Sequence, residues 1–194
     1  MNKYIAEAIG TFALTLVVGL SLAGEFPVST PILAALTLGL FVYSVGHLSG
    51  THLNPAVTIG AWSIKKISNE DAIAYLIAQF FGAAAALTLI STVATPETLT
   101  VTNEIKIGVA EGVGALFFAF GIASVVYGKT PNQLSGIMVG GSLLLGIAFA
   151  VLLGSNGLIN PAVAMGVKSF NVMYILGPII GSVVGMQAYK YLRE

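Results

Sequence analysis

The sequence predicts an all-α membrane protein with six transmembrane helices and two re-entrant half-helices, arranged as an inverted repeat. Three observations predict this fold. Of the 194 residues, 56% are hydrophobic and only 8% are charged, whereas a soluble domain carries about a quarter charged residues. Six apolar segments are long enough to cross a bilayer, and one Asn-Pro-Ala tripeptide occurs in each half of the chain.

Charge and cysteine content exclude several classes of protein. Eight basic residues balance eight acidic residues, and no basic stripe or acidic tail indicates nucleic acid or a strongly charged partner. The absence of cysteine excludes disulfides, thiolate catalysis and cysteine metal ligands. The N-terminus runs directly into an apolar segment without a cleavage pattern of small residues, so we expect a retained first span rather than a signal peptide.

Segment length identifies the six spans. A hydrocarbon core of about 30 Å requires about 20 helical residues at about 1.5 Å each. Segments of this length, separated by Pro, Asn, Gly and charged residues, cover residues 4–23, 31–48, 71–93, 107–127, 134–154 and 172–192. Two apolar stretches, residues 54–64 and 160–168, are too short to span and too apolar for ordinary loops.

The distribution of Lys and Arg predicts the orientation. With the N-terminus inside, only Lys106 and Lys168 lie outside, and six cations are cytoplasmic. Those six are Lys3, Lys65, Lys66, Lys129, Lys190 and Arg193. We therefore expect a multi-pass protein of the cell membrane with both termini in the cytoplasm.

The chain also repeats itself. Residues 6–10 recur at 110–114, and residues 54–60 recur at 160–166, with the order and spacing kept within two residues. We interpret residues 1–194 as one channel domain, with a first half at about 1–94 and a second half at about 105–194. Three spans per half place the second copy upside down, and the functional site of such a repeat is expected near the membrane midplane.

The Asn-Pro-Ala motifs predict two helix starts. Asn is a preferred N-cap, and Pro fits the first helical position because its missing N–H has no partner there. Two half-helices of about 15 Å, placed head to head, would cover about one hydrocarbon thickness. Their positive N-terminal ends and the Asn amide donors favour neutral, oxygen-bearing solutes over cations. The residues concerned are Asn54, Pro55, Ala56, Asn160, Pro161 and Ala162.

At these motifs the sequence resembles the aquaporin and aquaglyceroporin family, nearly from end to end. Residues 46–50, 77–82 and 177–181 support the resemblance. It implies a homotetramer with one pore per subunit, in which Glu7 and Glu111 brace the re-entrant loops and His47 lines the inner vestibule. It also implies pore-lining carbonyls at Gly50, Thr51, His52, Leu53, Asn156, Gly157, Leu158 and Ile159.

The sequence departs from the family at a second constriction, the selectivity filter. The family normally has an Arg directly after the second Asn-Pro-Ala, and this chain has Val163. Counting back from the two motifs places the other filter positions at Ala34, Ala148 and Gly157. Such a filter is wide but poor in hydrogen-bond donors. Glycerol, other small polyols, urea or dissolved gases could pass, or the apolar ring could wet poorly and conduct water slowly.

The sequence therefore predicts a passive channel for water and small uncharged solutes in membrane lipid. Two alternatives stay open: a secondary transporter, which also uses inverted repeats with broken helices, and a poorly conducting structural protein of the same fold. Proton relay is the alternative role for the two buried glutamates. Nothing indicates an enzyme, a cofactor or nucleic acid, and His47 and His52 lack the further ligands that a metal site needs.

Overall fold

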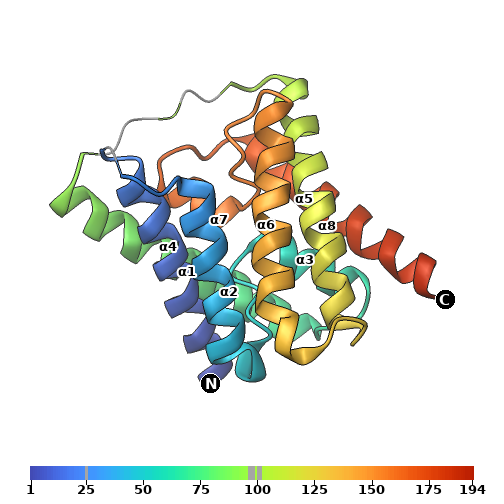
Figure 1. Ribbon diagram of the computed structural model, residues 1–194. Coiled ribbons are helices and arrows are strands. Elements are labelled where there is room, and N and C mark those ends of the chain that lie inside the picture. The colour runs from blue at the N-terminus through green and yellow to red at the C-terminus, as the bar shows by residue number, and fades with distance from the viewer. Residues whose placement is uncertain (25, 96–98, 100–101) are drawn as a thin grey trace.

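The computed structural model describes residues 1–24, 26–95, 99 and 102–194. The predicted linkers after the first and third spans therefore lie partly outside the described residues. Every regular element in these ranges is a helix (Figure 1). Six of them are long and apolar enough to cross a membrane, which confirms the predicted fold class.

The helix boundaries agree with the predicted spans within two residues. The long helices are α1 (Asn2–Ser21), α2 (Thr30–Ser49), α4 (Asn69–Val93), α5 (Ile105–Val126), α6 (Ser135–Leu152) and α8 (Val172–Arg193). The short ones are α3 (Pro55–Ser63) and α7 (Pro161–Gly166), together with the 3₁₀ turn η1 (Asn132–Leu134) ahead of α6.

The second half-helix is shorter than predicted. Helix α3 has nine residues and α7 has six, which correspond to about 14 Å and about 9 Å. Helix α7 ends at Gly166 because the chain turns at Lys168, whose φ of 58° is left-handed. The two half-helices therefore do not cover the hydrocarbon thickness alone, and the re-entrant loops complete the passage.

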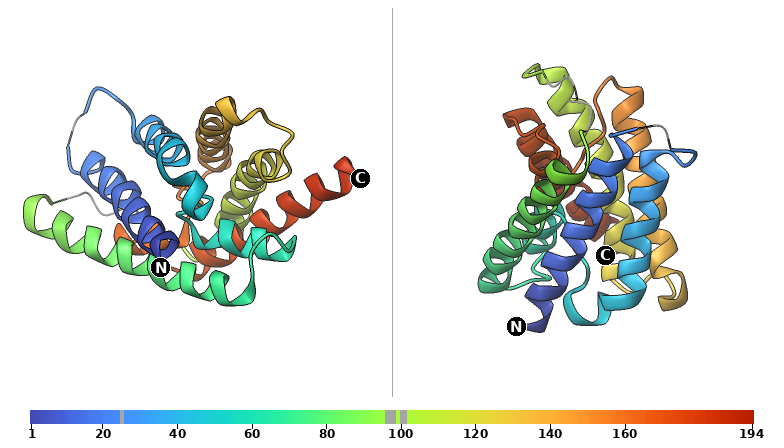
Figure 2. Two further views of the ribbon diagram at one scale, coloured as in Figure 1. Left: turned by 90° about the horizontal axis from the view of Figure 1, so that it is seen from below. Right: turned by 90° about the vertical axis from the view of Figure 1, so that its left-hand side faces the viewer.

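The helices pair in a pattern that repeats between the halves. Helix α1 packs against α4 and α2, α5 packs against α8 and α6, and α2 meets α6 across the halves. Figure 2 shows α1 beside α4 on one flank and α5 beside α8 on the other. Each half-helix crosses to the opposite half, since α3 packs against α8 and α7 against α4. The short helices thereby bind the two halves together.

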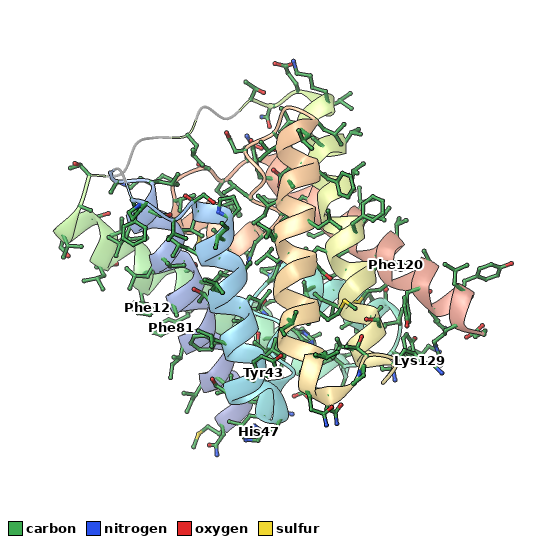
Figure 3. The ribbon with its side chains drawn as sticks, in the orientation of Figure 1. Phe12, Tyr43, His47, Phe81, Phe120 and Lys129 are labelled. Atoms are coloured by element: carbon green, nitrogen blue, oxygen red, sulfur yellow. The ribbon has the colours of Figure 1, made fainter. Side chains whose placement is uncertain are left out.

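Glycines allow the closest helix approach at equivalent places in the two halves. A Cβ on Gly82 of α4 would collide with the Ala8 carbonyl of α1, and one on Gly181 of α8 would collide with the Gly112 carbonyl of α5. Small residues are the usual device for bringing helix backbones together in lipid. The opposite surfaces are apolar and exposed, as for Phe81, which is 70% exposed on the outside of the bundle (Figure 3).

Candidate functional site

Each Asn-Pro-Ala motif begins a short helix. The side chain of Asn54 caps α3, and its Oδ1 accepts a hydrogen bond from the backbone N–H of Ala56 at 2.8 Å. Asn160 caps α7 in the same way and accepts from the N–H of Ala162 at 3.0 Å. The proline of each motif stands in the first turn, where its missing N–H leaves no carbonyl without a partner.

The two asparagines also reach across to the opposite half. Nδ2 of Asn54 donates to the carbonyl of Ile159 at 2.9 Å, and Nδ2 of Asn160 donates to the carbonyl of Leu53 at 2.9 Å. Both asparagines are almost fully buried. A primary amide has two N–H donors, and the second N–H of each makes no hydrogen bond within the described part of the chain. One donor of each amide therefore fixes the contact between the two halves.

The residue before each asparagine has a strained backbone. Leu53 has a φ of 48° and Ile159 has a φ of 38°, in the left-handed region that branched residues rarely adopt. Both side chains are fully buried. The family resemblance implies pore-lining carbonyls at both positions, which stays a prediction. In the structure these two carbonyls accept the asparagine amides, and neither residue lines the distal or the proximal cavity defined below.

Glu7 holds the first re-entrant loop from α1. It is fully buried, and its carboxylate accepts four hydrogen bonds. The donors are Ser49 Oγ at 2.7 Å, His52 N at 2.9 Å, Leu53 N at 2.7 Å and Gln79 Nε2 at 2.8 Å. The carboxylate thus joins the loop to α1 and α4, as a brace would.

Glu111 makes the equivalent contacts from α5 to the second loop. It is also fully buried. Its Oε1 accepts from Ser155 Oγ and from the N–H of Leu158 at 3.1 Å, and its Oε2 accepts from the N–H of Ile159 at 2.5 Å. Each carboxylate binds several donors of its re-entrant loop, which favours a structural role over a proton relay.

Two serines and two tyrosines that contact the re-entrant loops have no place in the sequence-based site. The Tyr75 hydroxyl donates to the Ser49 carbonyl at 2.8 Å, and the Tyr174 hydroxyl accepts from Asn156 Nδ2 at 2.8 Å. Ser49 and Ser155 are related by the same shift as the two asparagines, so the repeat could have revealed them. The tyrosines lie on α4 and α8 and could not be linked to the loops without the packing.

A cavity of about 110 Å³ lies at the end of the bundle away from the chain termini. We call it the distal cavity. Asn160 stands at its inner end, and its other walls are largely apolar. They include Leu14, Val18, Ala34, Leu143, Ile147, Gly157, Leu158 and Val163. Asn156, from the second re-entrant loop, also lines it beside Gly157.

Three of the four predicted filter positions meet in the distal cavity. Ala34, Gly157 and Val163 line it, and Ala148 does not, because Ala148 is exposed on the outer face of α6. Its neighbour Ile147 is buried and lines the cavity instead. Successive residues of a helix point about 100° apart around its axis. An error of one position in the sequence-based count therefore exchanges a side chain that faces the cavity for one on the outer face of α6.

A second cavity of about 520 Å³, the proximal cavity, lies at the end where both termini are found. Gly50, Thr51 and His52 of the first re-entrant loop line it. His47 is exposed in the last turn of α2 and is not among the lining residues, so its place in an inner vestibule stays a prediction. His52 lines this cavity, with Nδ1 at 3.1 Å from Thr58 Oγ1. The two cavities share no lining residue, and the asparagine pair lies between them.

Neither cavity contains the ligands of a metal centre. Within residues 1–24, 26–95, 99 and 102–194, no group of three His, Cys, Asp or Glu side chains could hold a metal ion. The site instead offers amide donors, backbone carbonyls and apolar walls. That arrangement can bind and release small neutral molecules.

Comparison with known proteins agrees with this geometry. The aquaporin AqpM of Methanothermobacter thermautotrophicus is 31% identical over an alignment of 241 residues, which covers all of this chain and 98% of that protein. The aquaporin NIP1-1 of Zea mays is 29% identical over all of this chain and 75% of its own length. The X-ray structure of the aquaglyceroporin from Plasmodium falciparum superposes with a TM-score of 0.70 at 22% identity, covering 98% of this chain and 96% of that one.

A family model identifies the chain more directly. The model of the major intrinsic proteins matches residues 1–189, and the matched region contains both Asn-Pro-Ala motifs, both buried glutamates, helices α1 to α7 and most of α8. This chain belongs to the major intrinsic protein family.

Proposed function

We propose that this protein is a passive transmembrane channel for water and small uncharged solutes. One observation carries the proposal: the crossed hydrogen bonds of Asn54 and Asn160 form a polar junction between two cavities at opposite ends of one membrane-spanning bundle. The similarity to aquaporins supports the same function.

The junction is suited to neutral molecules. The N-terminal ends of α3 and α7 carry partial positive charge, which repels cations and relayed protons. The free N–H of each asparagine amide can donate to the oxygen of water or of a hydroxyl group. Glu7 and Glu111 lie close by, but their hydrogen bonds to the loops occupy them. The expected result is flux of neutral solutes without ion conductance.

The distal cavity sets the size and character of the solute. Ala34, Ile147, Gly157 and Val163 surround the passage, and none of them offers a side-chain donor. Without an Arg or an aromatic ring the opening is wider and less polar than an aquaporin filter that contains both. We therefore expect solutes larger than water, such as glycerol or urea, to enter.

Assembly and orientation complete the proposal. The resemblance to aquaporins supports a homotetramer with one pore per subunit. The end of the bundle with both termini carries six of the eight Lys and Arg residues, which supports cytoplasmic termini. Light scattering of the purified protein in detergent tests the tetramer, and protease access to a C-terminal tag in sealed vesicles tests the orientation.

The decisive experiment measures flux in liposomes that contain the purified protein. Shrinkage is followed by stopped-flow light scattering, first in a sucrose gradient and then in a glycerol gradient. Fast shrinkage in sucrose and fast re-swelling in glycerol support a wide channel, and the Asn54→Leu/Asn160→Leu double variant serves as the control. Saturable, ion-coupled flux would indicate a transporter, and rates equal to those of empty liposomes would indicate a structural protein.

A further inference from the structure

Three separate segments bring cations together at the end of the bundle that carries both termini. The loop after α3 contributes Lys66, the turn after α5 contributes Lys129, and the last turn of α8 contributes Arg193. We call these three residues the basic cluster. Lys129 lies at this end of the bundle, close to the end of α8 (Figure 3).

One aromatic ring organises the cluster. Lys66 Nζ lies 4.5 Å from the centroid of the Tyr127 ring, and Arg193 Cζ lies 3.7 Å from the same centroid. The ring of Tyr189 stacks on Tyr127 with the centroids 6.1 Å apart and the planes 14° apart. Cation–π contacts of this kind hold a cation in place while its N–H donors stay available at the rim. The fold therefore places two cations from distant segments against the same ring.

No protein anion neutralises these charges in the described part of the chain. The ion pairs found there are Lys3 with Asp71 and Lys106 with Glu104. Asp71 is the acidic side chain that lines the proximal cavity together with Lys66, and it is occupied by Lys3 and by the Tyr4 hydroxyl. The general excess of cations on cytoplasmic loops explains which end the cluster occupies. It does not explain why two cations from distant segments contact one ring.

We propose that the basic cluster binds the phosphate group of an anionic phospholipid in the adjacent leaflet. An Arg guanidinium forms paired hydrogen bonds with phosphate, and a Lys ammonium adds a mobile point charge. The cluster stands at the ends of α5 and α8, where the lipid headgroups lie. Exposed apolar side chains of α8, including Leu192 and Val184, continue from it toward the bilayer interior and offer a surface for the acyl chains. These side chains favour a lipid over soluble phosphate.

The chain carries its own probe for this site. Trp62 is the only tryptophan, it is 49% exposed, and it lies in the last turn of α3, just before Lys66. The full-length protein is reconstituted in phosphatidylcholine vesicles with increasing fractions of brominated phosphatidylglycerol or brominated phosphatidylcholine, whose bromine atoms quench tryptophan. We expect brominated phosphatidylglycerol to quench half of the Trp62 fluorescence at a fraction about threefold lower than brominated phosphatidylcholine needs.

The variants separate the cluster from general surface charge. The Lys66→Gln/Arg193→Gln double variant should quench equally with both lipids, whereas Lys168→Gln, which removes an exposed lysine at the opposite end, should keep the preference. Lys129→Gln should reduce the preference partly, which guards against a folding defect in the double variant. Equal quenching of the unaltered protein, or an unchanged preference in the double variant, overturns the proposal. Loss of the preference on adding millimolar inorganic phosphate at constant ionic strength also overturns it, in favour of a soluble ligand.

Discussion

Replacing Glu111 by Gln tests the brace of the second loop. The carboxylate accepts from Ser155, Leu158 and Ile159. In the variant one oxygen becomes an NH₂ group, which cannot accept. The milder orientation places the NH₂ group at the position of Oε2, which accepts only the N–H of Ile159. That buried N–H then has no partner, which costs about 1–3 kcal/mol. For a chain of this size, each kcal/mol lowers the melting temperature by about 2–4 °C, so we expect a fall of roughly 2–12 °C.

The assay is thermal unfolding in detergent, followed by Trp62 fluorescence, together with water permeability in liposomes. Glu104→Gln is the matched control, because Glu104 is exposed and its ion pair with Lys106 stabilises the protein little. Permeability of the Glu111→Gln variant should fall, since Ile159 precedes the Asn160 cap. Equal melting temperatures of the two variants would refute the reasoning, because they would mean that residue 111 already carries a proton and that its amide analogue replaces it without loss.

Three further predictions follow from the same contacts. Ile147→Phe should reduce water permeability about tenfold by filling the distal cavity, whereas Ala148→Phe should leave the stopped-flow rate near that of the unaltered protein. A larger loss of permeability in Ala148→Phe than in Ile147→Phe would restore the filter position to Ala148. Gly181→Ala should destabilise the α5–α8 contact by about 1–3 kcal/mol, and Gly141→Ala, where a Cβ meets open space, should not lower the melting temperature. Asn160→Ala removes a cap worth about 0.5–2 kcal/mol and one crossed hydrogen bond, so both the melting temperature and the water flux should fall. An unchanged melting temperature or an unchanged flux would contradict the role proposed for the asparagine pair.

The sequence predicts the helices and the two motifs because their signals are local or repeated. Span length depends on an apolar run of sufficient extent, and the N-cap chemistry of Asn54 requires only its own neighbours. The resemblance to the aquaporin family then implies the relation between distant segments, such as Glu7 with the first loop and Glu111 with the second. These features need no knowledge of how side chains pack.

The remaining details depend on packing that no local pattern contains. Ala148 and Ile147 are adjacent and both apolar, so only the rotation of α6 decides which of them faces the cavity. His47 and His52 are both polar residues near the first motif. Only the end of α2 and the course of the following loop decide that His52 lines the proximal cavity and that His47 does not. The short α7 depends on a turn at Lys168, where the sequence has no glycine to indicate it.

The crossed amides also constrain the order in which the protein can be completed during synthesis. The carbonyl partner of Asn54 belongs to Ile159, 105 residues later in the chain. A nascent chain that has inserted only α1 to α4 can bond its first loop to Glu7, but it lacks the acceptor for the Asn54 amide and the donor for the Leu53 carbonyl. Each polar group needs the other half before it can leave water without cost. The first half must therefore stay adaptable in the translocon until the ribosome has delivered the second, and a chain stopped between the halves is a substrate for quality control.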